Sequence, residues 1–126
     1  MEVRVLSPFK QEDSEQLWLG LDTPGMVRKV FRLVSKELVN SEHFCAGLTI
    51  FEPGEASSYH NHPDSEEINV ILSGSGLARS GDETIPFKEQ DFCFIPKGVY
   101  HQHINTSDEP LLLIWVYTPQ APLPTT

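Results

Sequence analysis

Short apolar segments separated by turn-forming residues dominate the middle of this 126-residue sequence and constrain its fold more than any other feature. Clusters of Gly, Pro, Asp and Ser recur at intervals of roughly ten residues, and the segments between them are rich in β-branched and aromatic residues. Such segments are typical of strands, because a helix needs a longer stretch with a 3.6-residue period. The pattern predicts an all-β sandwich or barrel.

The segments expected to form strands can be read directly between the turns. They are Val27 to Val34, Phe44 to Phe51, Ile68 to Leu72, Leu77 to Ser80, Phe92 to Ile95, Tyr100 to Ile104 and Leu111 to Tyr117. Ile68 to Leu72 is expected to be a buried strand, and Ser73 to Gly76 a hairpin turn after it. Gln11 to Leu21 is ambiguous between a short helix and an edge strand.

A chain of this length forms one domain with its own core. We expect residues 1–40 to supply strands or a short helix that packs on the barrel or swaps with it. Residues 41–118 are expected to form the barrel itself. Residues 119–126 are expected to be a flexible tail.

Charge and hydropathy exclude several classes of partner. The formal net charge is −9 and the basic residues are scattered, so a nucleic-acid partner is not expected. Residues 1–30 contain no continuous apolar stretch, which predicts neither a signal peptide nor a membrane span. A cytoplasmic location is therefore expected, with Cys45 and Cys93 as reduced thiols.

Four of the five histidines form two close pairs, and these carry the strongest functional signal. They are His60-Asn61-His62 and His101-Gln102-His103, and Glu67 follows the first pair. A strand sends residues i and i+2 to the same face, so each pair places two imidazoles side by side. Imidazoles and a carboxylate without thiolate suit Fe(II), Mn(II), Ni(II), Zn(II) or Co(II). His43 is expected to be a surface residue.

The histidines belong to two longer motifs through which the chain resembles the cupin superfamily. The first reads Gly54, five residues, His60-Asn61-His62, four residues, Glu67, six residues, Gly74. The second reads Pro96-Lys97-Gly98, two residues, His101, three residues, Asn105. One position departs from the second motif: Gln90 stands where a glycine with positive φ is usual, and a side chain makes that conformation costlier.

This resemblance, which covers roughly Phe44 to Tyr117, implies a fold, a cofactor and an assembly. The fold would be a small double-stranded β-helix, the jelly-roll barrel of single-domain cupins, with one divalent first-row metal ion inside its open end. The resemblance carries the ligand roles onto His60, His62, Glu67 and His101. Small cupins commonly dimerise, so a homodimer is expected.

Several other residues are candidates for contacting a substrate or moving a proton. His103 shares a face with His101 and would either transfer protons or make a structural hydrogen bond. Glu67 is the other candidate for proton transfer, besides its role as a metal ligand. Asn69 lies two residues after Glu67 and is expected on the same face of the strand. It would contact a bound ligand or orient a metal-ligating side chain. Tyr59 and Trp115 are further substrate-binding candidates, and the alternative for both is a place in the core. Arg79 would either bind a substrate carboxylate through two hydrogen bonds or lie exposed on the rim of the barrel.

The residues support more than one function. The first interpretation is a metal-dependent enzyme for a small polar molecule, acting by dioxygenation, isomerisation, lyase chemistry or decarboxylation. Cupins that decarboxylate oxalate usually carry an arginine where this chain has Ser57, which disfavours oxalate. The alternative is a non-catalytic module that binds a metal and a small ligand as a sensor. A metal-free sugar-nucleotide epimerase-like barrel is a third interpretation, which the complete ligand set disfavours.

Overall fold

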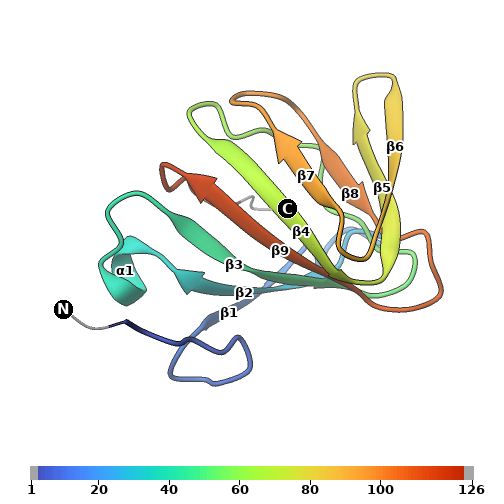
Figure 1. Cartoon of the computed structure of the whole chain (residues 1–126). Helices are drawn as coiled ribbons and strands as arrows, with labels where there is room; N and C mark the ends of the chain where they lie inside the picture. The colour runs from blue at the N-terminus through green and yellow to red at the C-terminus, as the bar shows by residue number, and fades with distance from the viewer. Residues whose placement is uncertain (1–2, 124–126) are drawn as a thin grey trace.

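The computed structural model describes residues 3–123, and strands make up most of its regular structure (Figure 1). The elements are β1 (Glu15–Leu19), β2 (Arg28–Val34), α1 (Lys36–Val39), β3 (Cys45–Phe51), β4 (Glu66–Ser73), β5 (Ser75–Ser80), β6 (Glu83–Lys88), β7 (Phe92–Ile95), β8 (Gln102–Ile104) and β9 (Leu111–Thr118). No helix among residues 3–123 is long and apolar enough to cross a membrane. The predicted all-β fold of jelly-roll type is confirmed.

Two antiparallel sheets build the molecule. One has six strands in the order β1-β2-β3-β9-β4-β7, and the other has three in the order β6-β5-β8. The last strand lies in the middle of the larger sheet, where Tyr117 pairs with Cys45 on one side and with Glu67 on the other. This order brings residues from both ends of the chain to one interior surface.

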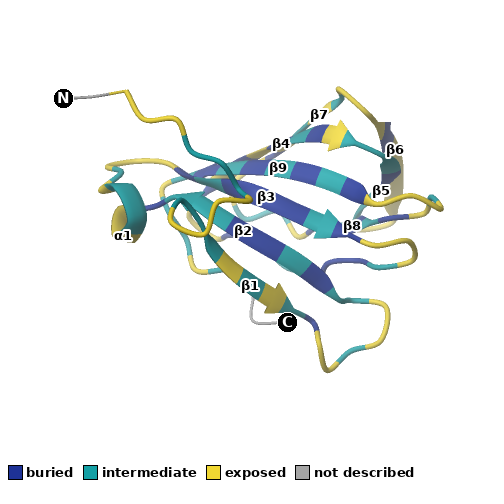
Figure 2. Ribbon diagram, turned by 90° about the horizontal axis from the view of Figure 1, so that it is seen from below, coloured by how far each residue is buried: buried dark blue, intermediate teal, exposed yellow. Residues whose placement is uncertain are grey.

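Alternation along the strands defines that interior. Every second residue of β9 is buried. β2 and β3 also mix buried and less buried residues (Figure 2), but Val30 and Phe31 in β2, and Gly47 to Thr49 in β3, are buried consecutively. Residues i and i+2 of a strand face the same side, so one face of the sheet lines the core. The buried apolar cluster consists of Val30, Cys45, Phe51, Ile71, Phe87, Leu111, Leu113, Trp115 and Tyr117.

Two expectations for the strand around Ile68 to Leu72 were wrong. Ile68 and Leu72 are 44% and 50% exposed, because β4 buries only the residues that alternate with them. The turn after it is no hairpin, since β4 pairs with β7 and β9 whereas β5 pairs with β6 and β8. Gly74, with φ of 93°, passes the chain from one sheet to the other so close to Pro110 that a Cβ would lie 2.7 Å from its carbonyl oxygen.

The N-terminal region extends the larger sheet. Gln11 to Leu21 contains β1, which forms the edge beside β2, so the edge-strand alternative holds. α1 is a single turn, and the Ser35 hydroxyl caps it by accepting a hydrogen bond from the Leu38 N–H.

The C-terminal segment returns to the sheet after β9. The Pro119 carbonyl accepts a hydrogen bond from the Ser65 hydroxyl, and Ala121 and Leu123 pack against the core. These contacts do not measure mobility, so the flexible tail stays a prediction for residues 119–123. Residues 124–126 lie outside the described part of the chain.

Gln90 adopts the conformation that the family motif normally assigns to glycine. Its φ is 75°, and its backbone N–H donates to the Ile71 carbonyl at 2.8 Å. The following Asp91 accepts a hydrogen bond from the Lys88 N–H through its carboxylate at 2.9 Å. The turn is therefore kept, with its backbone strain placed on a residue that has a side chain.

Candidate metal centre

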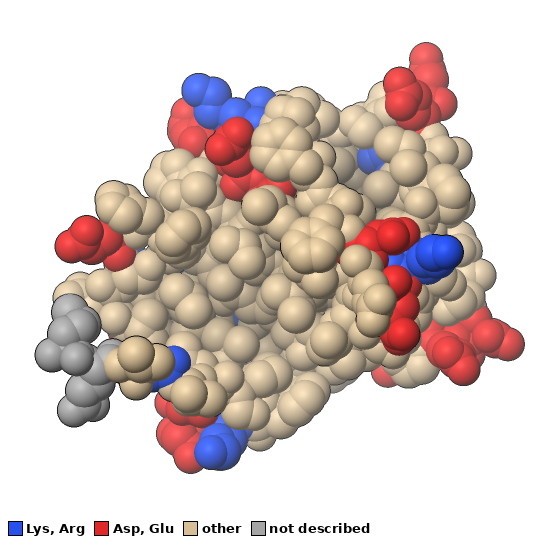
Figure 3. All heavy atoms as spheres, viewed as in Figure 1, with Lys and Arg blue, Asp and Glu red and all other residues tan. Residues whose placement is uncertain are grey.

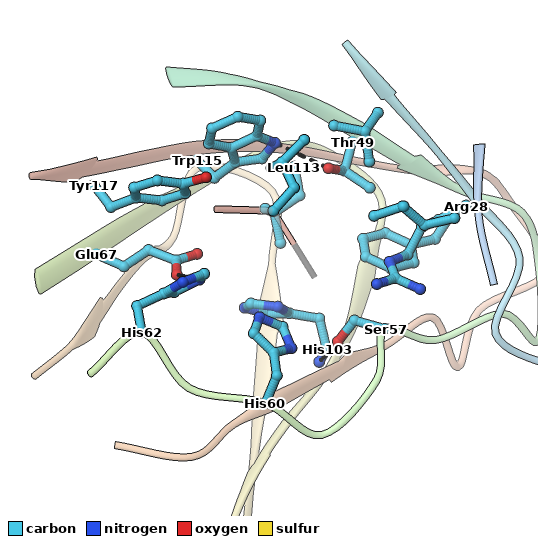
Figure 4. Close-up of a pocket in the computed structure, with 14 residues that line it drawn as sticks. Arg28, Thr49, Ser57, His60, His62, Glu67, His103, Leu113, Trp115 and Tyr117 are labelled. Atoms are coloured by element: carbon cyan, nitrogen blue, oxygen red, sulfur yellow. Dashed lines mark hydrogen bonds and ion pairs between the residues drawn. The ribbon is translucent and has the colours of Figure 1, made fainter. Parts of the chain in front are cut away.

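The four predicted ligands meet at one point inside the fold. The ligand nitrogens of His60, His62 and His101 lie within 4.8 Å of one another. Oε1 of Glu67 lies 3.2 Å from Nε2 of His62 and 3.5 Å from Nε2 of His101. Residues from the loop before β4, from β4 itself and from the segment before β8 therefore share one small volume. Figure 4 shows three of them, His60, His62 and Glu67.

Backbone hydrogen bonds fix the two histidine segments against each other. His60 and His101 form an isolated antiparallel bridge, in which each N–H donates to the other carbonyl at 3.0 and 2.8 Å. The Gly98 N–H donates to the His62 carbonyl at 3.0 Å, and Gly98 has a φ of 79°. The Pro96-Lys97-Gly98 turn thus holds the second segment beside the first, which explains its spacing from His101.

Carbonyl oxygens also orient two of the imidazoles. Nδ1 of His60 lies 2.9 Å from the Ser58 carbonyl, and Nδ1 of His101 lies 3.0 Å from the Val99 carbonyl. A carbonyl only accepts, so each Nδ1 carries the hydrogen in these bonds. Nε2 of a neutral ring then presents a lone pair to the common centre, as metal-ligating histidines do.

The buried polar atoms at the centre fit a divalent metal ion. Oε1 of Glu67 and Nε2 of His101 are both buried, and neither has a hydrogen-bond partner in the described part of the chain. Buried polar atoms without partners are rare and costly, and these two point at the same place as the other ligand nitrogens. Three imidazoles and a carboxylate form a donor set for Fe(II), Mn(II), Co(II), Ni(II) or Zn(II).

The electrostatics of the cluster prepare it for a cation. Burial lowers the pKa of His60 to about 4, which keeps this ring neutral near pH 7. Burial alone would raise the pKa of Glu67, but the neighbouring His101 and His62 hold the pKa below its usual range. Burial opposes protonation of His101, yet the Glu67 carboxylate raises its pKa on balance. The carboxylate is therefore ionised, and protons compete with a metal at His101.

A hydrogen-bonded chain links Glu67 to His103 through a fully buried asparagine. The Asn69 side-chain N–H donates to Oε2 of Glu67 at 2.7 Å, and its Oδ1 lies 2.8 Å from Nε2 of His103. An amide oxygen accepts, so Nε2 of His103 is the donor. Burial lowers the pKa of His103 to about 4, so the ring is neutral. Asn69 thus orients both side chains while Oε1 of Glu67 faces the histidines.

A cavity of about 50 Å³ adjoins the cluster (Figure 4). Trp115 and Tyr117 line it, and the Tyr117 ring stacks on His62 with ring centroids 4.8 Å apart. Nε1 of Trp115 donates to the Thr49 hydroxyl at 2.9 Å. The sequence analysis did not identify Arg28 among the polar lining residues. Arg28 lies two residues before Val30 in β2, so both side chains face the interior.

Two of the predicted substrate-binding residues lie away from this cavity. The Arg79 guanidinium sits 4.3 Å from the centroid of the Tyr59 ring, and its Nε donates to Gln102. Tyr59 in turn stacks on Tyr100 and accepts a hydrogen bond from the Gly81 N–H. Arg79 lines a second groove, of about 510 Å³, which His101 and His103 also line. Contact of Tyr59 or Arg79 with a substrate stays a prediction.

Comparison with known proteins places this arrangement in a family. The model of the cupin domain matches residues 47–117, more than half of the chain. The chain is similar to the polyketide synthase CurC of Streptomyces cyaneus, with 35% identity over 62% of this chain and 51% of that protein. It is also similar to gentisate 1,2 dioxygenase 1 of Aquipseudomonas alcaligenes, with 30% identity over 83% of this chain and 27% of that protein. The chain thus spans about half or less of these two relatives.

A solved structure supports the fold over nearly the whole chain. The crystal structure of a predicted oxalate decarboxylase from Thermotoga maritima superposes with a TM-score of 0.77. The match covers 93% of this chain and 100% of that one, at 23% sequence identity. At this identity the similarity concerns the fold alone.

Proposed function

This chain belongs to the cupin family, and on that premise we propose that it is a metal-dependent enzyme acting on a small polar molecule. One observation carries the proposal: Oε1 of Glu67 and Nε2 of His101 are buried, have no hydrogen-bond partner among residues 3–123, and face the same point as His60 and His62. A purely structural cluster would satisfy these atoms internally. Their arrangement is what a cation-binding site requires.

The proposed roles divide between holding the ion and handling the substrate. His60, His62, His101 and Glu67 hold the metal, which when bound supplies Lewis-acid polarisation of a substrate oxygen. Asn69 keeps the Glu67 carboxylate oriented, and the aromatic wall of Trp115 limits the access of water. Glu67 and His103 both line the cavity, so they are the candidate groups for moving a proton.

Dioxygenation is the reaction class to test first. The similarity to gentisate 1,2 dioxygenase 1 extends over 83% of this chain, although the chain spans only 27% of that protein. Isomerisation, lyase chemistry and decarboxylation follow, because the fold supports several reactions. Oxalate remains disfavoured: Ser57 is buried, and its hydroxyl accepts a hydrogen bond from the His103 N–H and donates one to the Ser58 carbonyl.

The test combines metal analysis with activity screens. Protein purified without chelator is analysed for metal, then reloaded in turn with Fe(II), Mn(II), Co(II), Ni(II) and Zn(II) and screened for oxygen uptake and product formation. The His60→Ala, His62→Ala double variant should lose the metal, whereas His43→Ala, at an exposed histidine, should retain it. Full occupancy in the double variant would refute the site. Ligand-induced stabilisation without any product would favour a sensor.

We also propose that two copies of the chain associate through the outer face of β4 and β7. Ile68, Leu72, Phe92 and Phe94 are 44% to 74% exposed there, and Ile68 pairs directly with Phe94 in the sheet. Figure 3 shows a broad uncharged area in the middle of the molecule, with acidic groups around it. Apolar areas of this kind are typical of interfaces. Light scattering should report a dimer that Phe92→Ser, Phe94→Ser converts to a monomer.

Location and other partners stay predictions. The net charge of −9 disfavours binding to nucleic acid, as the sequence analysis argued. A cytoplasmic location and the lack of a membrane partner rest on the sequence pattern. Fractionation of cells that produce the protein tests both.

A further inference from the structure

The second groove, of about 510 Å³, lies between the outermost strands of the two sheets. β7 ends the six-stranded sheet and β6 ends the three-stranded one, and within residues 3–123 these two strands do not pair with each other (Figure 1). Residues from β5, β6 and β7 line the groove, and so do His101 and His103. The fold is therefore open along this seam, next to one of the candidate metal ligands.

Side chains that share one face of the strands give the groove an apolar wall. Ala78 pairs with the buried His103 across β5 and β8, and Ile85 pairs with Ala78 across β5 and β6, so all three lie on the same face. Phe87 lies two residues after Ile85, and its ring meets His103 edge-on with ring centroids 6.1 Å apart. Cys93 on β7 is half-buried and packs against the core. A ligand in the groove would therefore contact mostly apolar atoms.

The charged residues of the groove do not direct their charges at this wall. Arg79 alternates with Ala78 along β5, and its guanidinium is engaged with the face of the Tyr59 ring. The Asp91 carboxylate accepts a hydrogen bond from a backbone N–H, and Glu83 is exposed at the start of β6. Burying a charge against apolar atoms without a partner is costly, so the groove favours a neutral ligand.

His103 supplies one hydrogen-bond acceptor beside this apolar wall. The Glu67 carboxylate accepts, so the Asn69 amide turns its N–H to Glu67 and its oxygen to His103. Nε2 of His103 therefore carries the hydrogen, and Nδ1 of the neutral ring keeps a lone pair. No group among residues 3–123 donates to this Nδ1, yet it is not one of the buried unpartnered atoms of that range. The nitrogen is therefore accessible to a small molecule.

We propose that the groove binds a neutral, largely apolar small molecule with one hydroxyl or N–H donor, and that Nδ1 of His103 accepts its hydrogen bond. The volume of about 510 Å³ lies within the range of about 300–1,000 Å³ that is usual for small-molecule sites. The cavity of about 50 Å³, which His103 also lines, accommodates only a few water molecules. A ligand of this class would lie beside His101 and so approach the metal centre from the groove.

The test compares two donor molecules with their methylated forms. Equilibrium dialysis at pH 8 measures the binding of 2-naphthol, 2-methoxynaphthalene, indole and 1-methylindole to chelator-treated protein. At least one donor should bind at least threefold more tightly than its methylated form, because only the donor pairs with Nδ1 of His103. Ile85→Ser, which removes part of the apolar wall, should weaken binding of that donor at least threefold. Leu21→Ser, at an exposed leucine outside the groove, should not.

A second variant tests the acceptor. His103→Leu should bind the donor and its methylated form equally. Where urea unfolding shows that His103→Leu does not fold, nitrogen NMR of the wild type replaces it: the donor should shift the Nδ1 resonance of His103, and the methylated form should not. No binding of either donor, or unchanged affinity in Ile85→Ser, or an equal loss in Leu21→Ser, would overturn the groove site. Equal binding of the two forms by the wild type, a preference that survives in His103→Leu, or an unmoved Nδ1 resonance would overturn the role of His103. These measurements use metal-free protein, so they succeed or fail independently of the metal centre, which Zn(II) uptake tests separately.

Discussion

Replacing Asn69 by leucine should weaken metal binding although Asn69 is not a ligand. Asn69 is fully buried, and its amide joins Oε2 of Glu67 at 2.7 Å to Nε2 of His103 at 2.8 Å. Leucine has a similar shape but no polar atom, so both partners would lose their hydrogen bonds inside the protein. The Glu67 carboxylate would then be free to turn away from the histidines.

The expected magnitudes follow from these two bonds. A buried polar group left without a partner costs about 1–3 kcal/mol, so the two together destabilise the metal-free protein by roughly 2–6 kcal/mol. Loss of a partner that orients a metal ligand typically costs about 10–100-fold in affinity, which equals roughly 1.4–2.7 kcal/mol. Asn69→Leu should therefore lower both the free energy of unfolding and the affinity for metal.

Asn105 provides the control. It is 1% exposed, and its amide donates to the Phe51 and Glu109 carbonyls at 3.0 and 2.8 Å. Asn105→Leu should therefore cost comparable stability without touching the metal ligands. Urea unfolding of chelator-treated protein measures stability, and competition with a chromophoric chelator for Co(II) measures affinity. Wild-type affinity in Asn69→Leu, or an equal loss in both variants, would refute the reasoning.

Four further predictions follow from single features. Gln90→Gly should raise the free energy of unfolding by about 1 kcal/mol, since glycine accepts the φ of 75° without strain; a loss of stability in urea titrations would contradict this. His103 is neutral, its pKa lowered by burial to about 4. The unfolded chain therefore takes up a proton below pH 6.5 that the folded chain refuses, so stability should fall as the pH drops from about 6.5 to 4. His103→Gln should reduce that slope by about 1.4 kcal/mol per pH unit in urea unfolding of metal-free protein, and an unchanged slope would count against it. Gly47→Ala should destabilise by about 3 kcal/mol or more, because the new Cβ would lie 2.2 Å from the Phe31 carbonyl oxygen; an unchanged thermal midpoint would exclude this close approach. Zn(II) at a hundred times its dissociation constant should stabilise the wild type by about 2.7 kcal/mol, and a chelator should remove the gain; the same gain in the His60→Ala, His62→Ala variant would place the metal elsewhere.

The four candidate metal ligands could be predicted from the sequence because the signals that mark them are local. His60-Asn61-His62, with Glu67 at a fixed interval, needs only the local loop and the start of one strand, and the Pro96-Lys97-Gly98 turn singles out His101 from its neighbour. The parity of Asn69 with Glu67 likewise predicted that both face inward, and both are buried. Spacing along one strand is a property of a few residues, and the sequence displays it directly.

The pairing of strands that lie far apart in the sequence could not be predicted from local patterns. β9 lies between β3 and β4, and this brings Trp115 and Tyr117 to the cavity. The prediction of a hairpin after Ile68 to Leu72 was wrong because it also depended on distant pairing: the turn joins strands of different sheets. Sheet order depends on which long-range pairs bury the most apolar surface, and no local pattern encodes that choice.

The sequence by itself determined the all-β class and the cupin resemblance, because alternation and turn spacing act over short distances. It also predicted the four residues of the candidate metal centre. The tertiary structure alone decided what surrounds that site. It placed Arg28 in the cavity and Arg79 in a second groove that His101 and His103 also line. It also joined His103 to Glu67 through Asn69. Those neighbours come from strands that meet only when the two sheets close around a common core, so their chemistry becomes visible only in the folded chain.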